Sequence, residues 1–345
     1  RQSYKSYPSA TFEIESSSSK SSNMLEGNII DKITNDYGYG WETFRAFIFC
    51  LLVGYCINII IFHPTSYILI LAKSFFFLGI DSDTLRILLS CIGLLMHGVG
   101  SFSAIFLSKY FSRRTMIFTS IITMFISCLI NTLFFNFYTY LIFIVFGCYF
   151  SGIADPLNQN ILCESLPVKL RGFFMCFSRF GLPISHLTHY LIMNFIYDEN
   201  NTNSIIYIQI VCSSILFILG SINIIMFRDS PRNLVIKEDL ETAFENLNLL
   251  LPDIKNVRSE EKQIIVKQMN KKINDRSLGN FTQLFGKIFL SSTIIFTCCI
   301  ILLQIFYAGI NNIVILYIKD SDKKLSENDI EKIGFILKLL ILAGP

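Results

Sequence analysis

Two oppositely charged residues inside long apolar stretches are the strongest candidates for chemistry in this sequence. Asp155 lies nine residues before Glu164, and Arg179 lies eight residues after Arg171. At a helical rise of about 1.5 Å per residue, the two side chains lie about 13 Å and about 12 Å from the same charged loop. A charge near the centre of a bilayer costs about 2.5–3.5 kcal/mol on insertion scales, so such a residue is expected to have a function. We therefore predict that Asp155 and Arg179 pair across adjacent helices.

Two interpretations of this pair stay open. In the first, the pair lines a central cavity and breaks and reforms as a solute or a proton binds. In the second, it is a static pair that fixes one helix against the next. Pro156 follows Asp155 directly and removes a backbone hydrogen bond, which opens the helix locally in either case.

Other polar residues in the apolar runs are weaker candidates. His97 lies in the middle of an earlier run, where it could carry a proton, although a hydrogen-bonded packing histidine is the plainer interpretation. Asn158 belongs to a group of three polar residues that follow Asp155 around the same helix, so at least one of the three is expected to face the cavity. The histidines expected at the outer membrane interface are His63, His186 and His189.

The chain contains no pattern typical of an enzyme. A phosphate-binding glycine loop, a cluster of metal ligands and a nucleophile triad are all missing from the sequence. Its ten cysteines form no CxxC pair and fall mostly inside apolar runs, where cysteine acts as a small apolar residue. We therefore expect no enzymatic activity, no cofactor, no metal and no nucleic-acid partner.

The composition places these candidates in a membrane protein. Of the 345 residues, 52% are hydrophobic and 16% are charged, compared with about 25% charged residues in a typical soluble domain. Backbone groups in lipid must be satisfied within the chain, so long apolar runs have to form helices. The predicted helices are 43–68, 84–107, 114–133, 138–163, 171–195, 204–227 and 284–318, with an eighth that begins near 331.

The distribution of Lys and Arg predicts the orientation of these helices. The basic residues of the short loops are Lys109, Arg113, Arg114, Lys169 and Arg171. The long connection 228–283 is also rich in Lys and Arg, whereas the connections near 134–137 and 196–203 contain none. Because basic loops remain in the cytoplasm, we place the N-terminus and the basic loops on that side.

Four segments follow from these patterns. Residues 1–42 are Ser-rich and are expected to form a disordered cytoplasmic tail, before a six-helix transmembrane bundle at 43–227. Residues 228–283 are predicted to be a cytoplasmic linker with surface helices, and 284–345 the start of a second bundle. The chain begins with Arg1 and stops inside an apolar run, so we expect it to be a fragment of a longer protein with two six-helix halves.

Three charged loops carry patterns that resemble those of a known family. Residues 164–172 read E-S-L-P-V-K-L-R-G, which resembles the E-x-x-P-x-x-x-R-G signature of sugar porters and synaptic-vesicle-type transporters. Residues 100–114 resemble the G-x-L-a-D-r-x-G-R-R signature of the major facilitator superfamily, with Lys109 and Ser112 in place of its Asp and second Gly. Residues 229–232, D-S-P-R, resemble its P-E-S-P-R signature.

This resemblance implies the major facilitator fold and alternating access by rocking of two halves. In that family, charged loop residues pair between helices and hold the outward-facing state. The residues expected to form this cytoplasmic latch are Arg113, Arg114, Glu164, Arg171, Asp229 and Arg232. Topology alone would explain the basic residues but not the two acids, because acids contribute little to it. The resemblance also makes Gln304 and Asn311, near a G-I-N motif, candidate solute contacts.

The sequence therefore predicts an all-α membrane protein with the N-terminal six-helix half of the major facilitator fold and the start of its second half. Its expected function is secondary active transport of a small polar or ionic organic solute across the lipid bilayer, with coupling to protons left open. Two alternatives remain: a sugar porter, and a transporter-like receptor or trafficking protein without turnover. The altered residues Lys109 and Ser112 motivate the second of these.

Overall fold

The computed structural model describes part of the chain, and each regular element in that part is an α-helix, which confirms the all-α fold class. The described residues are 40–66, 82–108, 110–196, 204–230, 233–234 and 239–250, with positions 291, 294, 295 and 298. The predicted tail 1–42, linker 228–283 and second bundle 284–345 lie wholly or mostly outside these residues.

The predicted helix ranges up to residue 227 agree with the structure to within a few residues, with one exception. The helices are α3 (Trp41–Ser66), α5 (Ser82–Leu107), α6 (Arg113–Leu133), α7 (Phe137–Ser165), α8 (Val168–Ser178), α9 (Gly181–Ile196), α10 (Ser204–Met226) and α12 (Leu240–Leu250). Among the described residues, four segments are long and apolar enough to cross a membrane: Trp41–His63, Arg113–Leu133, Phe137–Ser165 and Ser204–Met226. The exception is the range 171–195, which the structure divides into α8 and α9.

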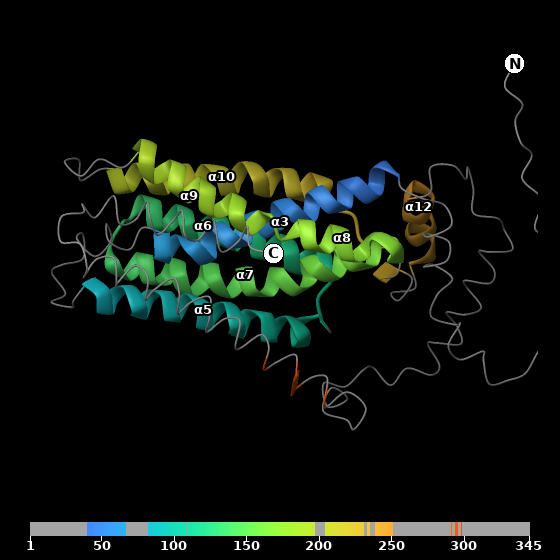
Figure 1. Ribbon diagram of the computed structural model, residues 1–345, viewed down its shortest axis with the longest axis horizontal. Helices are drawn as coiled ribbons and strands as arrows, with labels where there is room; N and C mark the ends of the chain where they lie inside the picture. The colour runs from blue at the N-terminus through green and yellow to red at the C-terminus, as the bar shows by residue number, and fades with distance from the viewer. Residues whose placement is uncertain are drawn as a thin grey trace, which may run out of the picture.

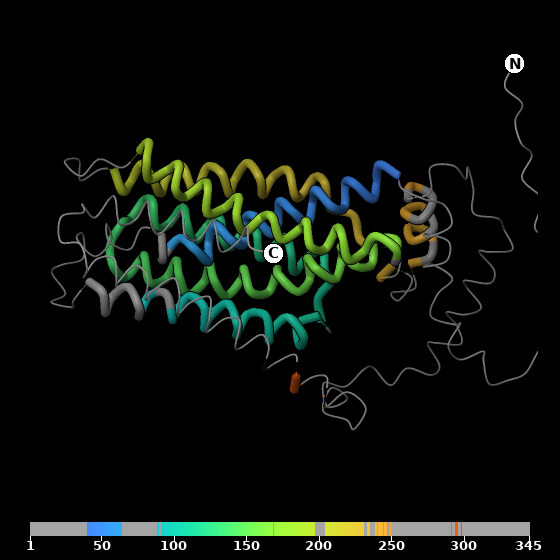
Figure 2. The backbone as a smooth tube through the Cα atoms, in the orientation of Figure 1, coloured from blue at the N-terminus to red at the C-terminus, as the bar shows by residue number. Residues whose placement is uncertain are grey.

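The helices form one bundle of roughly parallel axes, with the short α12 across one end (Figure 1). Helix α7 packs against α3, α5 and α6, and α10 packs against α3 and α6. The tube in Figure 2 shows the chain running back and forth, with the α5–α6 and α7–α8 connections at the same end as α12. We refer to this end, which contains Arg113 and Glu164, as the charged end.

The break between α8 and α9 has a cause in the sequence. Pro183 has no N–H, and its ring would clash with the carbonyl of Arg179 four residues earlier in a continuous helix. The Arg179 carbonyl instead accepts a hydrogen bond from the N–H of Leu182 at 3.0 Å, a tighter turn. Arg179 therefore lies at the junction of the two helices and not inside one.

Two glycines let α5 and α7 approach each other until their backbones touch. A Cβ atom at Gly100 would lie 2.0 Å from the carbonyl oxygen of Tyr149, and one at Gly152 would lie 2.0 Å from the carbonyl oxygen of His97. Small residues at such a contact are the usual means of close helix packing in membranes. This contact fixes His97 beside the middle of α7.

Pro156 strengthens the same contact. Because proline has no N–H, the Gly152 carbonyl four residues earlier has no donor within α7. The hydroxyl of Ser101 on α5 donates to this carbonyl at 3.0 Å, and the His97 carbonyl lies 3.1 Å from the same hydroxyl. The helix thus continues through Pro156, while the freed carbonyl bonds to the neighbouring helix.

We expect Gly100→Ala to destabilise the bundle, because the added methyl group would overlap the Tyr149 carbonyl. Overpacking of this kind typically costs about 1–3 kcal/mol, more than the roughly 0.5–1 kcal/mol by which alanine improves a helix over glycine. Thermal unfolding of the full-length protein in detergent would measure the difference. Gly98→Ala on the same helix is the matched control, since nothing lies within 4 Å of its Cβ position. Equal melting temperatures for the two variants would contradict this account of the α5–α7 contact.

Candidate functional site

The structure brings Asp155 and Arg179 together. Asp155 lies on α7 next to Pro156, and its Oδ1 is 3.7 Å from Nη1 of Arg179 at the α8–α9 break. The Asp155 side chain is 28% exposed and that of Arg179 is 64% exposed, so both can be reached from outside the packed core. The separation exceeds the 2.7–3.2 Å of a direct hydrogen bond. The pair is therefore close but loosely held.

His97 is the third member of this group, which we call the Asp155 cluster (Asp155, Arg179 and His97). Its Nε2 lies 3.9 Å from Oδ2 of Asp155, while Nδ1 lies 3.0 Å from the hydroxyl of Ser151, one turn earlier on α7. The two carboxylate oxygens thus face different partners, one a permanent cation and the other a titratable ring. Such a carboxylate can exchange between Arg179 and a proton.

Asn158 is not part of this cluster. It is fully buried, and its Nδ2 donates to the carbonyl of Cys50 on α3 at 2.8 Å. The thiol of Cys50 in turn faces the Asn158 carbonyl at 3.4 Å. In this conformation Asn158 joins α7 to α3, and its side chain is buried. The other two predicted solute contacts, Gln304 and Asn311, lie outside the described residues.

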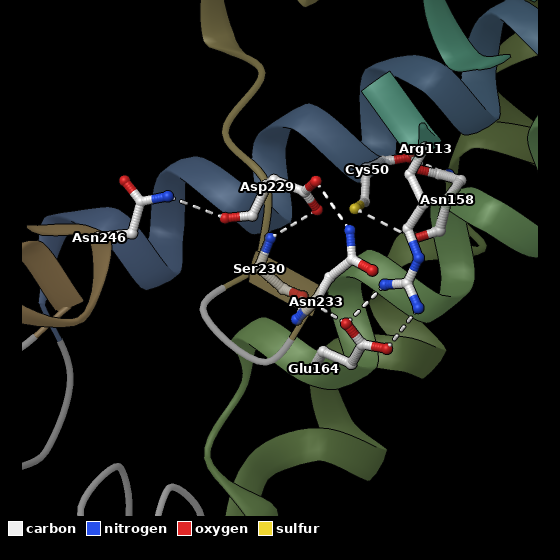
Figure 3. A network of polar contacts seen from close by, with 8 residues as sticks. All are labelled: Cys50, Arg113, Asn158, Glu164, Asp229, Ser230, Asn233 and Asn246. Carbon is white, nitrogen blue, oxygen red and sulfur yellow. Dashed lines mark hydrogen bonds and ion pairs between the residues drawn. The ribbon is translucent and has the colours of Figure 1, made fainter. Parts of the chain in front are cut away.

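A second charged group lies at the charged end and has a different geometry. Arg113, the first residue of α6, binds Glu164 near the end of α7 through two parallel hydrogen bonds of 2.6 and 2.9 Å. The hydroxyl of Ser230, after α10, donates to the same carboxylate (Figure 3). Both ionic side chains are about one-fifth exposed. One carboxylate therefore ties together the ends of three helices.

Asp229 takes part in this network through hydrogen bonds (Figure 3). Its carboxylate accepts hydrogen bonds from the Ser230 N–H at 3.0 Å and from the Asn233 amide at 2.8 Å. Its carbonyl accepts from the Asn246 amide on α12 at 3.1 Å. Asp229 thus orders the turn after α10 and attaches α12 to it.

Two of the remaining predicted latch residues have contacts of their own. Arg114 is exposed, and its guanidinium lies 5.3 Å from the ring of Phe118 one turn further along α6. Arg171 donates to the carbonyl of Leu166 at 3.3 Å, which stabilises the α7–α8 connection. Arg232 lies outside the described residues.

Sequence reasoning missed a further ion pair at this end. Glu42, in the first turn of α3, lies 3.1 Å from Arg228, just after α10. Arg45 binds Glu42 and the carbonyl of Met226. These residues line a pocket between the ends of α3 and α10. The i, i+3 spacing of Glu42 and Arg45 is a weak local signal of an ion pair between these two residues. Nothing in the local sequence indicates that Glu42 also pairs with Arg228, 186 residues away.

Three histidines that we expect at the outer membrane interface are buried among the helices. His63, His186 and His189 are at most 3% exposed. Nδ1 of His63 lies 3.3 Å from the Tyr140 hydroxyl, and Nε2 of His189 donates to the Ile59 carbonyl at 3.1 Å. His63 and His189 thus find hydrogen-bond partners on neighbouring helices inside the bundle.

No group of three or more His, Cys, Asp and Glu side chains suited to a metal occurs among the described residues. The fold and its charged groups thus define a multi-pass α-helical membrane protein with an ionisable cluster inside the bundle. Comparison of the sequence with known protein families then identifies the family within this class of membrane proteins. Residues 46–344 match the Major Facilitator Superfamily, and the chain belongs to that family.

Solved structures share this fold. The proton:xylose symporter XylE bound to 6-bromo-6-deoxy-D-glucose superposes with a TM-score of 0.64 at 20% identity, over 88% of this chain and 66% of that one. A partially occluded inward-open form of the xylose transporter XylE from E. coli superposes with a TM-score of 0.54 at 18% identity. The match covers 70% of this chain and 61% of that one. The chain thus spans about two thirds of the length of these proteins. No curated protein sequence matches it.

We expect Arg113 and Glu164 to stabilise the protein as a coupled pair. Charge-assisted hydrogen bonds contribute about 1.5–3 kcal/mol, and removing one partner leaves the other partly buried without its counterion. A double-mutant cycle with Arg113→Ala and Glu164→Ala, read by unfolding in detergent, should give a coupling energy in this range. The matched cycle of Arg114→Ala with Glu164→Ala should be additive, because Arg114 faces Phe118. Additivity in both cycles would contradict the pairing.

Proposed function

We propose that the protein is a secondary active transporter that moves a small polar or ionic organic solute by alternating access, coupled to protons through Asp155. The observation that carries this proposal is the contrast between its two acidic groups. Glu164 is held by two short hydrogen bonds from Arg113, whereas Asp155 lies 3.7 Å from Arg179 and 3.9 Å from His97. A static structural pair is expected to have the short, bidentate geometry of Glu164 and Arg113.

The loose geometry favours exchange. A charge inside a membrane bundle is costly, and it is retained where partners neutralise it in turn. An anionic solute group would compete with Asp155 for Arg179, and a cationic one would compete with Arg179 for Asp155. A proton on Asp155 would release Arg179 for the solute. Each event changes the charge of the Asp155 cluster, which lies between α7 and the break that joins α8 to α9. Such a change in charge supports coupling of solute or proton binding to a movement of these helices.

The tight network supports the other part of the mechanism. The charged end, which we infer to face the cytoplasm together with the N-terminus, ties the ends of α6 and α7 and the segment after α10 to Glu164. We propose that this network is a latch that keeps the six-helix half rigid while it rocks against a second half. Its acids support this role, since positive charge alone would be enough to set topology.

A sugar is the second candidate solute. The pattern of residues 164–172 resembles that of sugar porters, and two similar structures are described as a xylose symporter and a xylose transporter. At 18–20% identity these structures support the fold and not the solute. Uptake of labelled xylose, an organic cation and an organic anion by proteoliposomes of the full-length protein would separate the candidates. Binding without uptake would support a receptor.

We expect Asp155→Asn to reduce uptake driven by a proton gradient at least tenfold, while exchange of labelled for unlabelled solute continues. Asparagine cannot be ionised, so it cannot carry the proton, but a neutral side chain still allows the cluster to open. Arg179→Gln should impair both processes, because Asp155 would keep an uncompensated charge. Asp239→Asn, an exposed acid before α12, is the control and should transport normally. Normal gradient-driven uptake by Asp155→Asn would overturn the proposal.

A further inference from the structure

Ser151 is a buried neighbour of the Asp155 cluster. It lies on α7, four residues before Asp155, and no part of it is exposed. Its hydroxyl oxygen lies 3.0 Å from Nδ1 of His97 and 2.8 Å from the carbonyl oxygen of Cys148. A buried hydroxyl without access to water must make its hydrogen bonds with these neighbours.

The donors and acceptors at this point can be assigned one by one. We assign the single hydrogen of the Ser151 hydroxyl to the shorter of its two contacts, the 2.8 Å bond to the Cys148 carbonyl. The oxygen then has only lone pairs left for His97, and Nδ1 must carry the hydrogen of that bond. Since a neutral imidazole has one N–H, Nε2 carries a lone pair.

We propose that Ser151 is a positioning residue that holds neutral His97 in the Nδ1–H tautomer, so that its Nε2 is the proton acceptor facing Asp155. This inference rests on the proposed role of Asp155 in proton coupling. Nothing in the residue types alone selects this tautomer; the α5–α7 contact does, because it sets the His97 ring against Ser151.

The tautomer defines a proton step. When Asp155 is protonated on Oδ2, its O–H bond breaks and an N–H bond forms at Nε2 of His97. The products are a carboxylate and an imidazolium with hydrogens on both nitrogens, and the total charge is unchanged. The present 3.9 Å separation requires a small approach or one bridging water. The carboxylate is then free to bind Arg179, and reversal of the step returns the proton to Asp155.

The other charges near His97 act on this step in opposite directions. Among the described residues, the charged groups that act on the ring are Asp155 from α7 and Arg179 from the α8–α9 break. The carboxylate favours the imidazolium, and the guanidinium disfavours it. Because Arg179 lies next to Asp155, its main effect is on the carboxylate. Movement of Arg179 toward Asp155 would therefore favour transfer of the proton to His97, and movement away would favour its return to Asp155.

Nitrogen NMR of the full-length protein labelled at histidine tests the tautomer directly. The His97 signals are assigned by their loss in His97→Gln. We expect neutral His97 to carry its hydrogen on Nδ1, and Ser151→Ala to shift the population toward Nε2–H, since the acceptor for Nδ1 is weakened and Asp155 can accept from Nε2. An Nε2–H tautomer in the unmodified protein would overturn the inference.

Transport provides an independent readout. Ser151→Ala should lower proton-driven uptake about tenfold and displace its pH profile, with solute exchange and the KM for solute unchanged. The matched control is Ser127→Ala on α6, a buried serine that donates to the Met124 carbonyl at 2.9 Å in the same local pattern. It should show no shift of the pH profile. A merely structural role for Ser151 would lower protein yield without moving that profile.

The two proposals fail separately. If Asp155→Asn abolishes proton-driven uptake while Ser151→Ala changes neither the tautomer nor the pH profile, the role of Ser151 is overturned and the proposed function stands. If Asp155→Asn transports normally, the proposed function fails, and the proton step fails with it even where NMR finds the Nδ1–H tautomer.

Discussion

The backbone contact between α5 and α7 is the constraint on which the rest of the site depends. Gly100 and Gly152 each face a carbonyl of the other helix at a distance that leaves no room for a Cβ atom. Pro156 frees the Gly152 carbonyl, and Ser101 takes up the freed acceptor. The same packing brings the His97 ring against α7, so four residues without charge determine where the charged residues meet.

The two acidic groups illustrate how one bundle can be firm at its end and adjustable inside. At the charged end, a bidentate bond to Arg113 and a bond from Ser230 hold Glu164. Inside the bundle, Asp155 faces two partners and bonds directly to neither. Tight geometry makes a charge pair rigid, and loose geometry lets its members be exchanged. We therefore propose a structural role for the Glu164 network and a transport role for the Asp155 cluster.

Much of the fold followed from composition and loop charges. Apolar length predicted the helices up to residue 227, and counting residues from the α7–α8 connection placed Asp155 and Arg179 at one depth. Depth along a helix does not give the direction of a side chain, however. Asn158, less than one turn from Asp155, bonds to α3 instead, and the buried histidines were assigned to the interface. The predicted helix 171–195 overlooked the break at which Pro183 separates α8 from α9. The pairing of Glu42 with Arg228 required the assembled bundle.

The central claim is that the charge on Asp155 changes when solute binds. Infrared difference spectroscopy of the full-length protein in lipid, recorded on addition of solute, measures this change through the carboxylic acid C=O band. The account predicts a difference band in that region that disappears in Asp155→Asn and persists in Glu164→Gln. Solute binding without any such band, or with a band that Asp155→Asn leaves in place, would contradict it.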